Sequence, residues 1–61
     1  MKPRYLAVIL VKYPDADVAE IFHVSTDFQG CKNFFEYCLE MKKKLKGDEQ
    51  YFFETYVFKG D

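Results

Sequence analysis

The longest apolar run of the chain covers residues 5–11, where every position is hydrophobic and several side chains are β-branched. A short continuous run of this kind is typical of a central strand that is covered on both faces. Pro14, Asp15 and Asp17 follow closely and supply turn chemistry, because proline presets φ and Asp side chains bond local backbone. Residues 18–25 have mixed character and predict a second strand. The two segments together predict a β-hairpin.

A different spacing begins after residue 25, where apolar side chains recur every three or four residues, as on one face of a helix. Thr26 and Gln29 fit a capping box, and Asp27 suits the positive end of the helix dipole. Lysines then crowd the far end ahead of Gly47, a natural residue just beyond a helix. We therefore expect a helix over residues 27–46. Its apolar stripe consists of Phe28, Cys31, Phe34, Phe35, Cys38, Met41 and Leu45.

Residues 50–59 are dense in Tyr and Phe and predict a third strand. Pairing this strand with the first makes every contact antiparallel and places the most apolar strand in the centre. A right-handed crossover puts the helix on one side of the sheet. The expected class is α+β, with ββαβ order, a three-stranded antiparallel sheet (order 2-1-3) and one helix packed on one face. We expect residues 1–61 to form a single domain.

The sheet face away from the helix is the candidate binding surface. Pairing Tyr13 with Val18 across the turn sorts the hairpin side chains, and the face that carries Glu20 is expected to point away from the helix because a charge beneath it is costly. A register slip of one residue would exchange the two faces. The same argument turns Phe52, Glu54, Tyr56 and Phe58 outward and Tyr51, Phe53 and Val57 toward the helix. The predicted partner-binding residues are Tyr5, Ile9, Val11, Tyr13, Phe22, Phe52, Tyr56 and Phe58.

Composition explains why such a face needs a partner. The 61 residues are 49% hydrophobic and 20% aromatic, and a chain this short buries only about 60% of its unfolded surface. Large apolar patches left on a soluble protein usually mark interfaces. We expect a homodimer that buries sheet against sheet. A different protein partner, and a monomer whose loops partly cover the face, are the alternatives.

Charge narrows the choice of partner. The formal net charge is −1, so the whole molecule has no field that attracts nucleic acid or an anionic membrane. No apolar stretch approaches the roughly 18 residues of a membrane span. The start of the chain has a basic segment and then an apolar run, as signal peptides do, but no small-residue cleavage site follows. The sequence therefore predicts a cytoplasmic protein with no membrane association.

The inventory of reactive residues disfavours catalysis and metal binding. His23 is the single histidine, and it is expected to be a half-buried strand residue. Cys31 and Cys38 are roughly 10 Å apart on a helix, which is too far for a disulfide or one shared zinc. They are expected to be reduced core residues, and an intermolecular disulfide or a redox sensor is the alternative. We expect no enzyme activity, no metal and no cofactor.

Two functions remain. The first is a small non-enzymatic protein-interaction module, an inhibitor of the phage or mobile-element type that binds a larger host protein or complex as a homodimer. The alternative is a nucleic-acid-binding protein that stacks bases on Tyr5, Tyr13, Phe22 and Tyr56, as the open sheets of RNA-binding modules do. Its weakness is that no cationic groove accompanies the aromatic residues.

Overall fold

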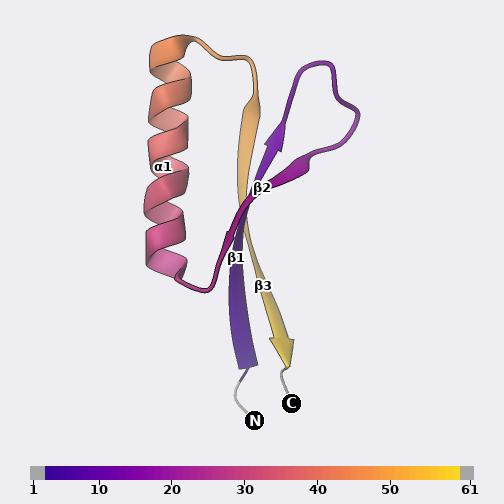
Figure 1. Cartoon of the computed structure of the whole chain (residues 1–61), viewed down its shortest axis with the longest axis vertical. Coiled ribbons are helices and arrows are strands. Elements are labelled where there is room, and N and C mark those ends of the chain that lie inside the picture. The colour runs from indigo at the N-terminus through magenta and orange to yellow at the C-terminus, as the bar shows by residue number, and fades with distance from the viewer. Residues whose placement is uncertain (1–2, 60–61) are drawn as a thin grey trace.

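The fold is a three-stranded sheet with one helix against it, as seen in a computed structural model that describes residues 3–59 and the side chains of residues 5–57 (Figure 1). The elements follow one another as β1 (Pro3–Lys12), β2 (Glu20–Ser25), α1 (Phe28–Leu45) and β3 (Gln50–Lys59). The strands lie in the order β2-β1-β3, and both neighbouring pairs are antiparallel. This confirms the predicted α+β class, the ββαβ order and the strand order 2-1-3.

The central strand β1 has two different neighbours. Its register with β3 is unbroken from Pro3 opposite Lys59 to Lys12 opposite Gln50. Its register with β2 begins as predicted beside the turn, with Val11 opposite Glu20 and Leu10 opposite Ile21, and then shifts. Ile9 faces His23, so Phe22 is the extra residue of a β-bulge. A bulge bends a strand and increases its local twist.

The helix begins one residue later than its capping signal suggests. Asp27 is the N-cap, and its Oδ1 accepts a hydrogen bond from the N–H of Gly30 at 3.1 Å. The hydroxyl of Ser25 in turn accepts from the N–H of Asp27 at 2.9 Å. The predicted capping box of Thr26 and Gln29 is therefore wrong by one position, because it is the Asp27 carboxylate that accepts from a free N–H group of the first turn, that of Gly30. The side chain of Gln29 donates to Asn33 instead.

A left-handed residue ends the helix, and it is Lys46 rather than Gly47. Lys46 has φ 54° and ψ 44°, and the N–H of Gly47 reaches back to the carbonyl of Lys42 at 2.9 Å. With the second bond from Lys46 N–H to the carbonyl of Lys43, these contacts form a Schellman motif. The pattern predicted the correct place for the stop, but a lysine has the backbone conformation that glycine adopts more easily.

The core lies between α1 and one face of the sheet. Ala7 and Ile9 of β1 meet Cys31 of α1, and all three are buried. The side chains of Cys31 and Ala7 are small, so the helix comes close to the central strand. Larger rings close the two sides of this contact, and they belong to Phe34, Phe35, Tyr51 and Phe53.

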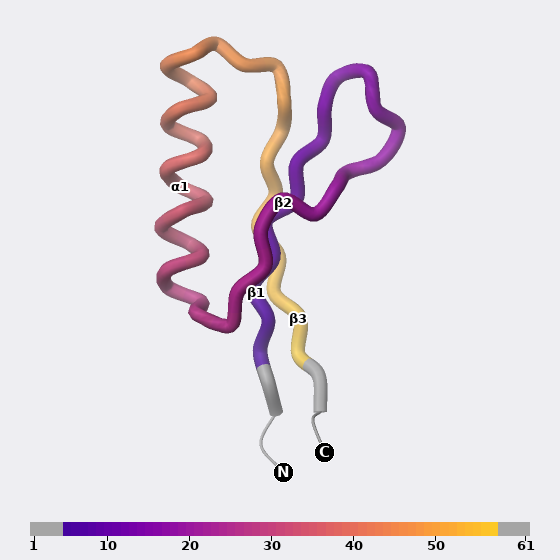
Figure 2. The backbone as a smooth tube through the Cα atoms, in the orientation of Figure 1, coloured from indigo at the N-terminus to yellow at the C-terminus, as the bar shows by residue number. Residues whose placement is uncertain are grey.

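The molecule is long and thin, because β1 and β3 pair over ten residues each and one helix forms the second layer. The Cα trace measures 44 × 25 × 10 Å and its radius of gyration is 13.3 Å, against about 10.5 Å for a compact domain of this length. Figure 2 shows β1 and β3 running together along most of the long axis, whereas β2 accompanies only part of it. Within residues 3–59, no helix covers the face of the sheet that lies opposite α1.

Candidate functional site

The candidate site is the sheet face opposite α1, which we call the open face. Alternate side chains of a strand point to opposite faces, and Ala7 and Ile9 point to the helix. Leu10 therefore points away from it, together with Ile21 and Phe52, which lie opposite Leu10 on the two neighbouring strands. The described side chains of the open face include Leu6, Val8, Leu10, Ile21, Val24, Phe52, Glu54 and Tyr56. Val8, at the centre of β1, is only 4% exposed.

The face assignment predicted for β1 is wrong. Ile9 and Val11 are buried at 0% and 2% exposure and point to the helix side with Tyr5. Glu20 misled the prediction: it does pair with Val11, yet it lies at the end of β2 and is exposed, so no charge is buried. The signal that would have corrected the error is Ala7, the smallest side chain of the run, which leaves room for a helix.

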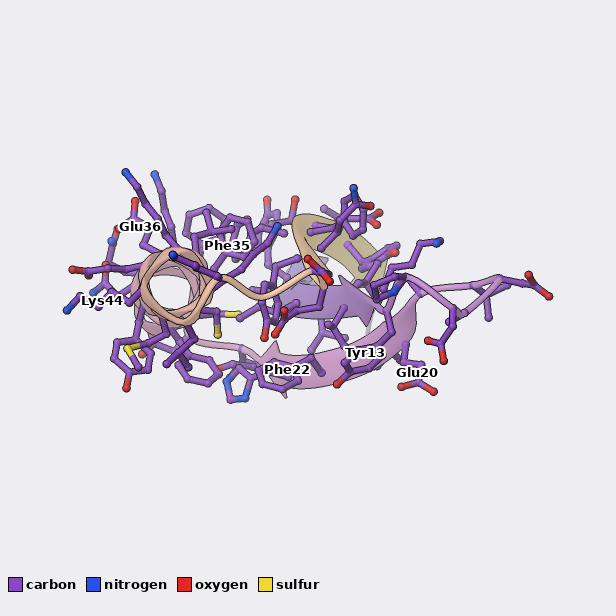
Figure 3. All side chains as sticks on the ribbon, turned by 90° about the horizontal axis from the view of Figure 1, so that it is seen from above. Tyr13, Glu20, Phe22, Phe35, Glu36 and Lys44 are labelled. Atoms are coloured by element: carbon purple, nitrogen blue, oxygen red, sulfur yellow. The ribbon has the colours of Figure 1, made fainter. Side chains whose placement is uncertain are left out.

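Phe22 and Tyr13 also lie on the helix side. The ring of Phe22 stacks on Phe34 with 6.0 Å between centroids and meets the edge of Tyr51 at 5.6 Å. Figure 3 shows Tyr13 and Phe22 on the same side of the ribbon. Both follow the inverted face of β1, because Tyr13 and Phe22 share the face of Ile9 and Val11 in the predicted register. The bulge adds His23 to this side, since it sets His23 opposite Ile9 and both rings contact Phe34. Placing Phe22 on the open face was therefore wrong.

The prediction for β3 is confirmed where the structure describes it. Phe52 and Tyr56 lie on the open face, and Tyr51 and Phe53 pack toward the helix. The side chain of Phe58 lies outside the described residues. The prediction missed four apolar members of the open face because it assigned β1 and the start of β2 to the wrong side. These members are Leu6, Val8, Leu10 and Ile21. Val24 was expected on the open face and does lie there, because the bulge reverses the faces beyond Phe22 and so cancels the first error.

The open face is apolar and carries one carboxylate near its middle. Ile21 is 69% exposed and Phe52 41% exposed. Glu54 lies opposite Val8, and its Oε1 accepts a hydrogen bond from the hydroxyl of Tyr56 at 3.2 Å. This hydrogen bond and the charge of Glu54 raise the pKa of Tyr56 above its usual value, since both hold the phenolic proton. The open face is therefore an apolar surface with the Glu54 carboxylate near its middle.

The chain exposes more surface than a compact protein of its mass. It exposes 4939 Å², whereas a compact protein of 7.3 kDa exposes about 4,200 Å². The difference of about 750 Å² reflects the elongated shape, to which the open face and the projecting turn of the hairpin both contribute.

On the helix side of the sheet, by contrast, aromatic rings of the strands and of α1 pack against one another. Phe34 packs between Phe22 and Tyr37, and the ring of His23 meets Phe34 edge-on at 5.0 Å. This contact agrees with the prediction of a half-buried, structural His23. On the β3 side, Phe28 and Phe35 both contact Phe53 at 5.5 Å between centroids.

The reactive groups are arranged for packing. Cys31 and Cys38 are free and buried, as predicted for reduced core residues. Burial raises the pKa of both thiols, and the Asp27 carboxylate raises that of Cys31 further, so neither is an activated nucleophile. Burial and then the charge of Glu49 raise the pKa of Tyr51. In the described part of the chain, no three metal-ligating side chains come together and no pocket is present.

No helix within residues 3–59 has the length and apolar character needed to cross a membrane. In comparisons with known proteins, no family model, no curated protein and no solved structure matched this chain. The function must therefore be argued from the geometry of the two faces.

Proposed function

We propose that this protein is a non-enzymatic protein-interaction module, and that its open face binds an apolar surface on a larger protein. The observation that carries the proposal is the apolar sheet face that no other described element covers. Exposed patches of this kind on soluble proteins mark interaction sites. The module acts as a homodimer, because a core formed by one helix against one face of the sheet gives only marginal stability to a chain of this length.

Glu54 gives the partner a second requirement. A carboxylate buried in an interface without a counter-charge is costly. The hydroxyl of Tyr56 bonds one oxygen of Glu54, which leaves the other oxygen available. The complementary surface is therefore an apolar patch that presents a lysine or arginine to this position.

The separation of the aromatic residues weighs against the nucleic-acid alternative. Its stacking platform requires Tyr5, Tyr13, Phe22 and Tyr56 on one face. Tyr56 lies on the open face and the other three lie on the helix side. The open face also carries a carboxylate near its middle where phosphates would require a cation.

Affinity capture with matched baits tests the proposal. The parent chain, Ile21→Glu and Val18→Glu are each incubated with extract of the organism that encodes the protein. Ile21 and Val18 are 69% and 70% exposed, but Val18 lies in the turn region and only Ile21 is on the open face. The partner should be retained by the parent and by Val18→Glu and lost with Ile21→Glu. Equal capture by all three baits, or capture by none, would contradict the proposal.

A second pair of variants tests the role of the Glu54 carboxylate. Glu54→Gln should keep the shape of the open face and weaken capture, whereas Glu49→Gln, near the start of β3, should leave capture unchanged. The narrower expectation, an inhibitor of the phage or mobile-element type, remains a prediction. It gains support if the retained protein is a host enzyme whose activity falls when the parent chain is added.

A further inference from the structure

The two outer edges of the sheet differ in how well they are protected. β2 is six residues long and is interrupted by the bulge at Phe22. Short strands and bulges are two devices by which proteins prevent an edge from pairing with another chain. β3 is ten residues long, and its register with β1 contains no irregularity. Its other side is the outer edge of the sheet.

The sequence of β3 adds little further protection, since its one lysine, Lys59, is at the end of the strand. Phe52, Phe53, Tyr56 and Val57 favour extended structure, and no proline interrupts the strand. Natural edge strands often carry several charges, especially lysine. Within residues 50–57 the one charged side chain is Glu54. One oxygen of Glu54 accepts a hydrogen bond from the hydroxyl of Tyr56 on the same strand.

Resting on the proposed homodimer, we propose that the dimer forms at this edge: β3 pairs antiparallel with β3 of a second copy, and Thr55 lies opposite Thr55. The strand order across the dimer becomes 2-1-3-3-1-2. A two-fold axis normal to the sheet keeps residues of like face opposite one another, so the two helices lie on one side. The two open faces then join into one continuous surface on the other side.

Charge disfavours one neighbouring register, and hydrogen bonding favours this one. With Thr55 on the axis, Glu54 lies opposite Tyr56 of the second copy, so each carboxylate meets a second hydroxyl. Moving the axis to Glu54 would place two carboxylates directly opposite each other, which destabilises a strand pair. The chosen register also sets Phe53 opposite Val57 of the second copy, an apolar pair on the helix side. Within one chain, Tyr56 already donates to Glu54 at 3.2 Å, so the two groups have compatible geometry.

A charge swap at the axis tests the proposal. Thr55→Lys alone and Thr55→Glu alone should each raise the dimer Kd, by up to about fivefold, because like charges then face each other across the axis. An equimolar mixture of the two variants should restore dimerisation to at least the parental affinity. Sedimentation equilibrium at low ionic strength measures the mass, since salt screens these charges. The parent is expected to approach twice its chain mass of 7.3 kDa.

Thr26→Lys is the matched control, because it makes the same chemical change at an exposed position outside the strands. It should dimerise like the parent, and circular dichroism should show all variants folded. Dimerisation of Thr55→Lys with parental affinity would overturn the edge pairing, as would failure of the mixture to dimerise. A dimer that Ile21→Glu abolishes and Thr55→Lys preserves would instead indicate sheet-against-sheet packing.

The two proposals fail separately. A parent chain that stays monomeric at all concentrations overturns the edge pairing, whereas the matched capture with Ile21→Glu and Val18→Glu still decides whether the open face binds a protein. Conversely, a dimer with the charge-swap behaviour and no difference between those two baits supports the edge and removes the open-face function.

Discussion

The two faces of this sheet have similar hydrophobicity and opposite roles. The covered face contains Ala7, Ile9 and Val11, all buried, with Cys31 of the helix against it. The open face contains side chains of equal or greater apolar bulk, including Leu10, Ile21 and Phe52, and no helix reaches them. Hydrophobicity alone therefore does not decide which face becomes the core. The presence of a small residue such as Ala7, which admits a helix, does.

The largest test of this contrast compares two isoleucines. Ile9→Ala removes a fully buried side chain from the covered face and should cost about 3 kcal/mol. Ile21→Ala removes the same atoms from the open face and should change the free energy of unfolding by about 0.5 kcal/mol or less. Urea denaturation at low protein concentration measures both.

Domains of this size have only about 3–5 kcal/mol of stability, so Ile9→Ala is expected to be largely unfolded at 37 °C. If the two variants lost equal stability, another layer would cover the open face under the conditions of the measurement. A concentration dependence of the Ile21→Ala loss would identify that layer as a second copy.

The next effect, of intermediate size, is the pH dependence of the unfolding free energy, which tests the burial of the two thiols of α1. Burial raises the pKa of Cys31 and Cys38 in the folded state, so the unfolded chain releases these protons first as the pH rises. Their contribution is complete below the ordinary thiol pKa and is lost as the pH rises through the folded value. Unfolding free energy should therefore fall above about pH 9.

The double variant Cys31→Ala, Cys38→Ala is the control. It should show a smaller loss between neutral and alkaline pH, and the remaining slope belongs in part to Tyr51, whose pKa is also raised by burial. An identical pH profile in the parent and the double variant would mean that the thiols titrate as freely as they do in the unfolded chain.

The smallest expected effect concerns the C-terminal end of α1, the helix that covers one of the two faces. Lys46 is left-handed with φ 54°, so Lys46→Gly should stabilise the fold by about 0.5 kcal/mol, the relief of strain being partly offset by lost charge near the helix end. Lys32→Gly, at an exposed position within the helix, should destabilise by about 1 kcal/mol. Thermal unfolding distinguishes the two, and a loss of stability in both would contradict the strain at Lys46.

Much of the fold could be predicted from residue pattern. The helix and the strand order followed from spacing, and the face assignment of β3 was correct because Glu54, in the middle of the strand, does lie away from the helix. Strand β1 could not be assigned in this way, since residues 5–11 are apolar on both sides. The charge of Glu20 was used to break the tie, and it failed because the end of β2 leaves that side chain exposed. The bulge at Phe22 has no signature in a single sequence.

That bulge determines what the open face is made of. Ile21 and Val24 are three residues apart and would point to opposite faces of a regular strand, yet both lie on the open face because Phe22 is the extra residue between them. Which side chains form the open face therefore depends on the number of residues in β2 as well as on their identity. Deletion of one residue in β2 would move a whole set of side chains from one face to the other, which no single substitution does. Insertions and deletions in this short strand are thus a route by which related chains could acquire a different binding surface while keeping the same helix contact with β1.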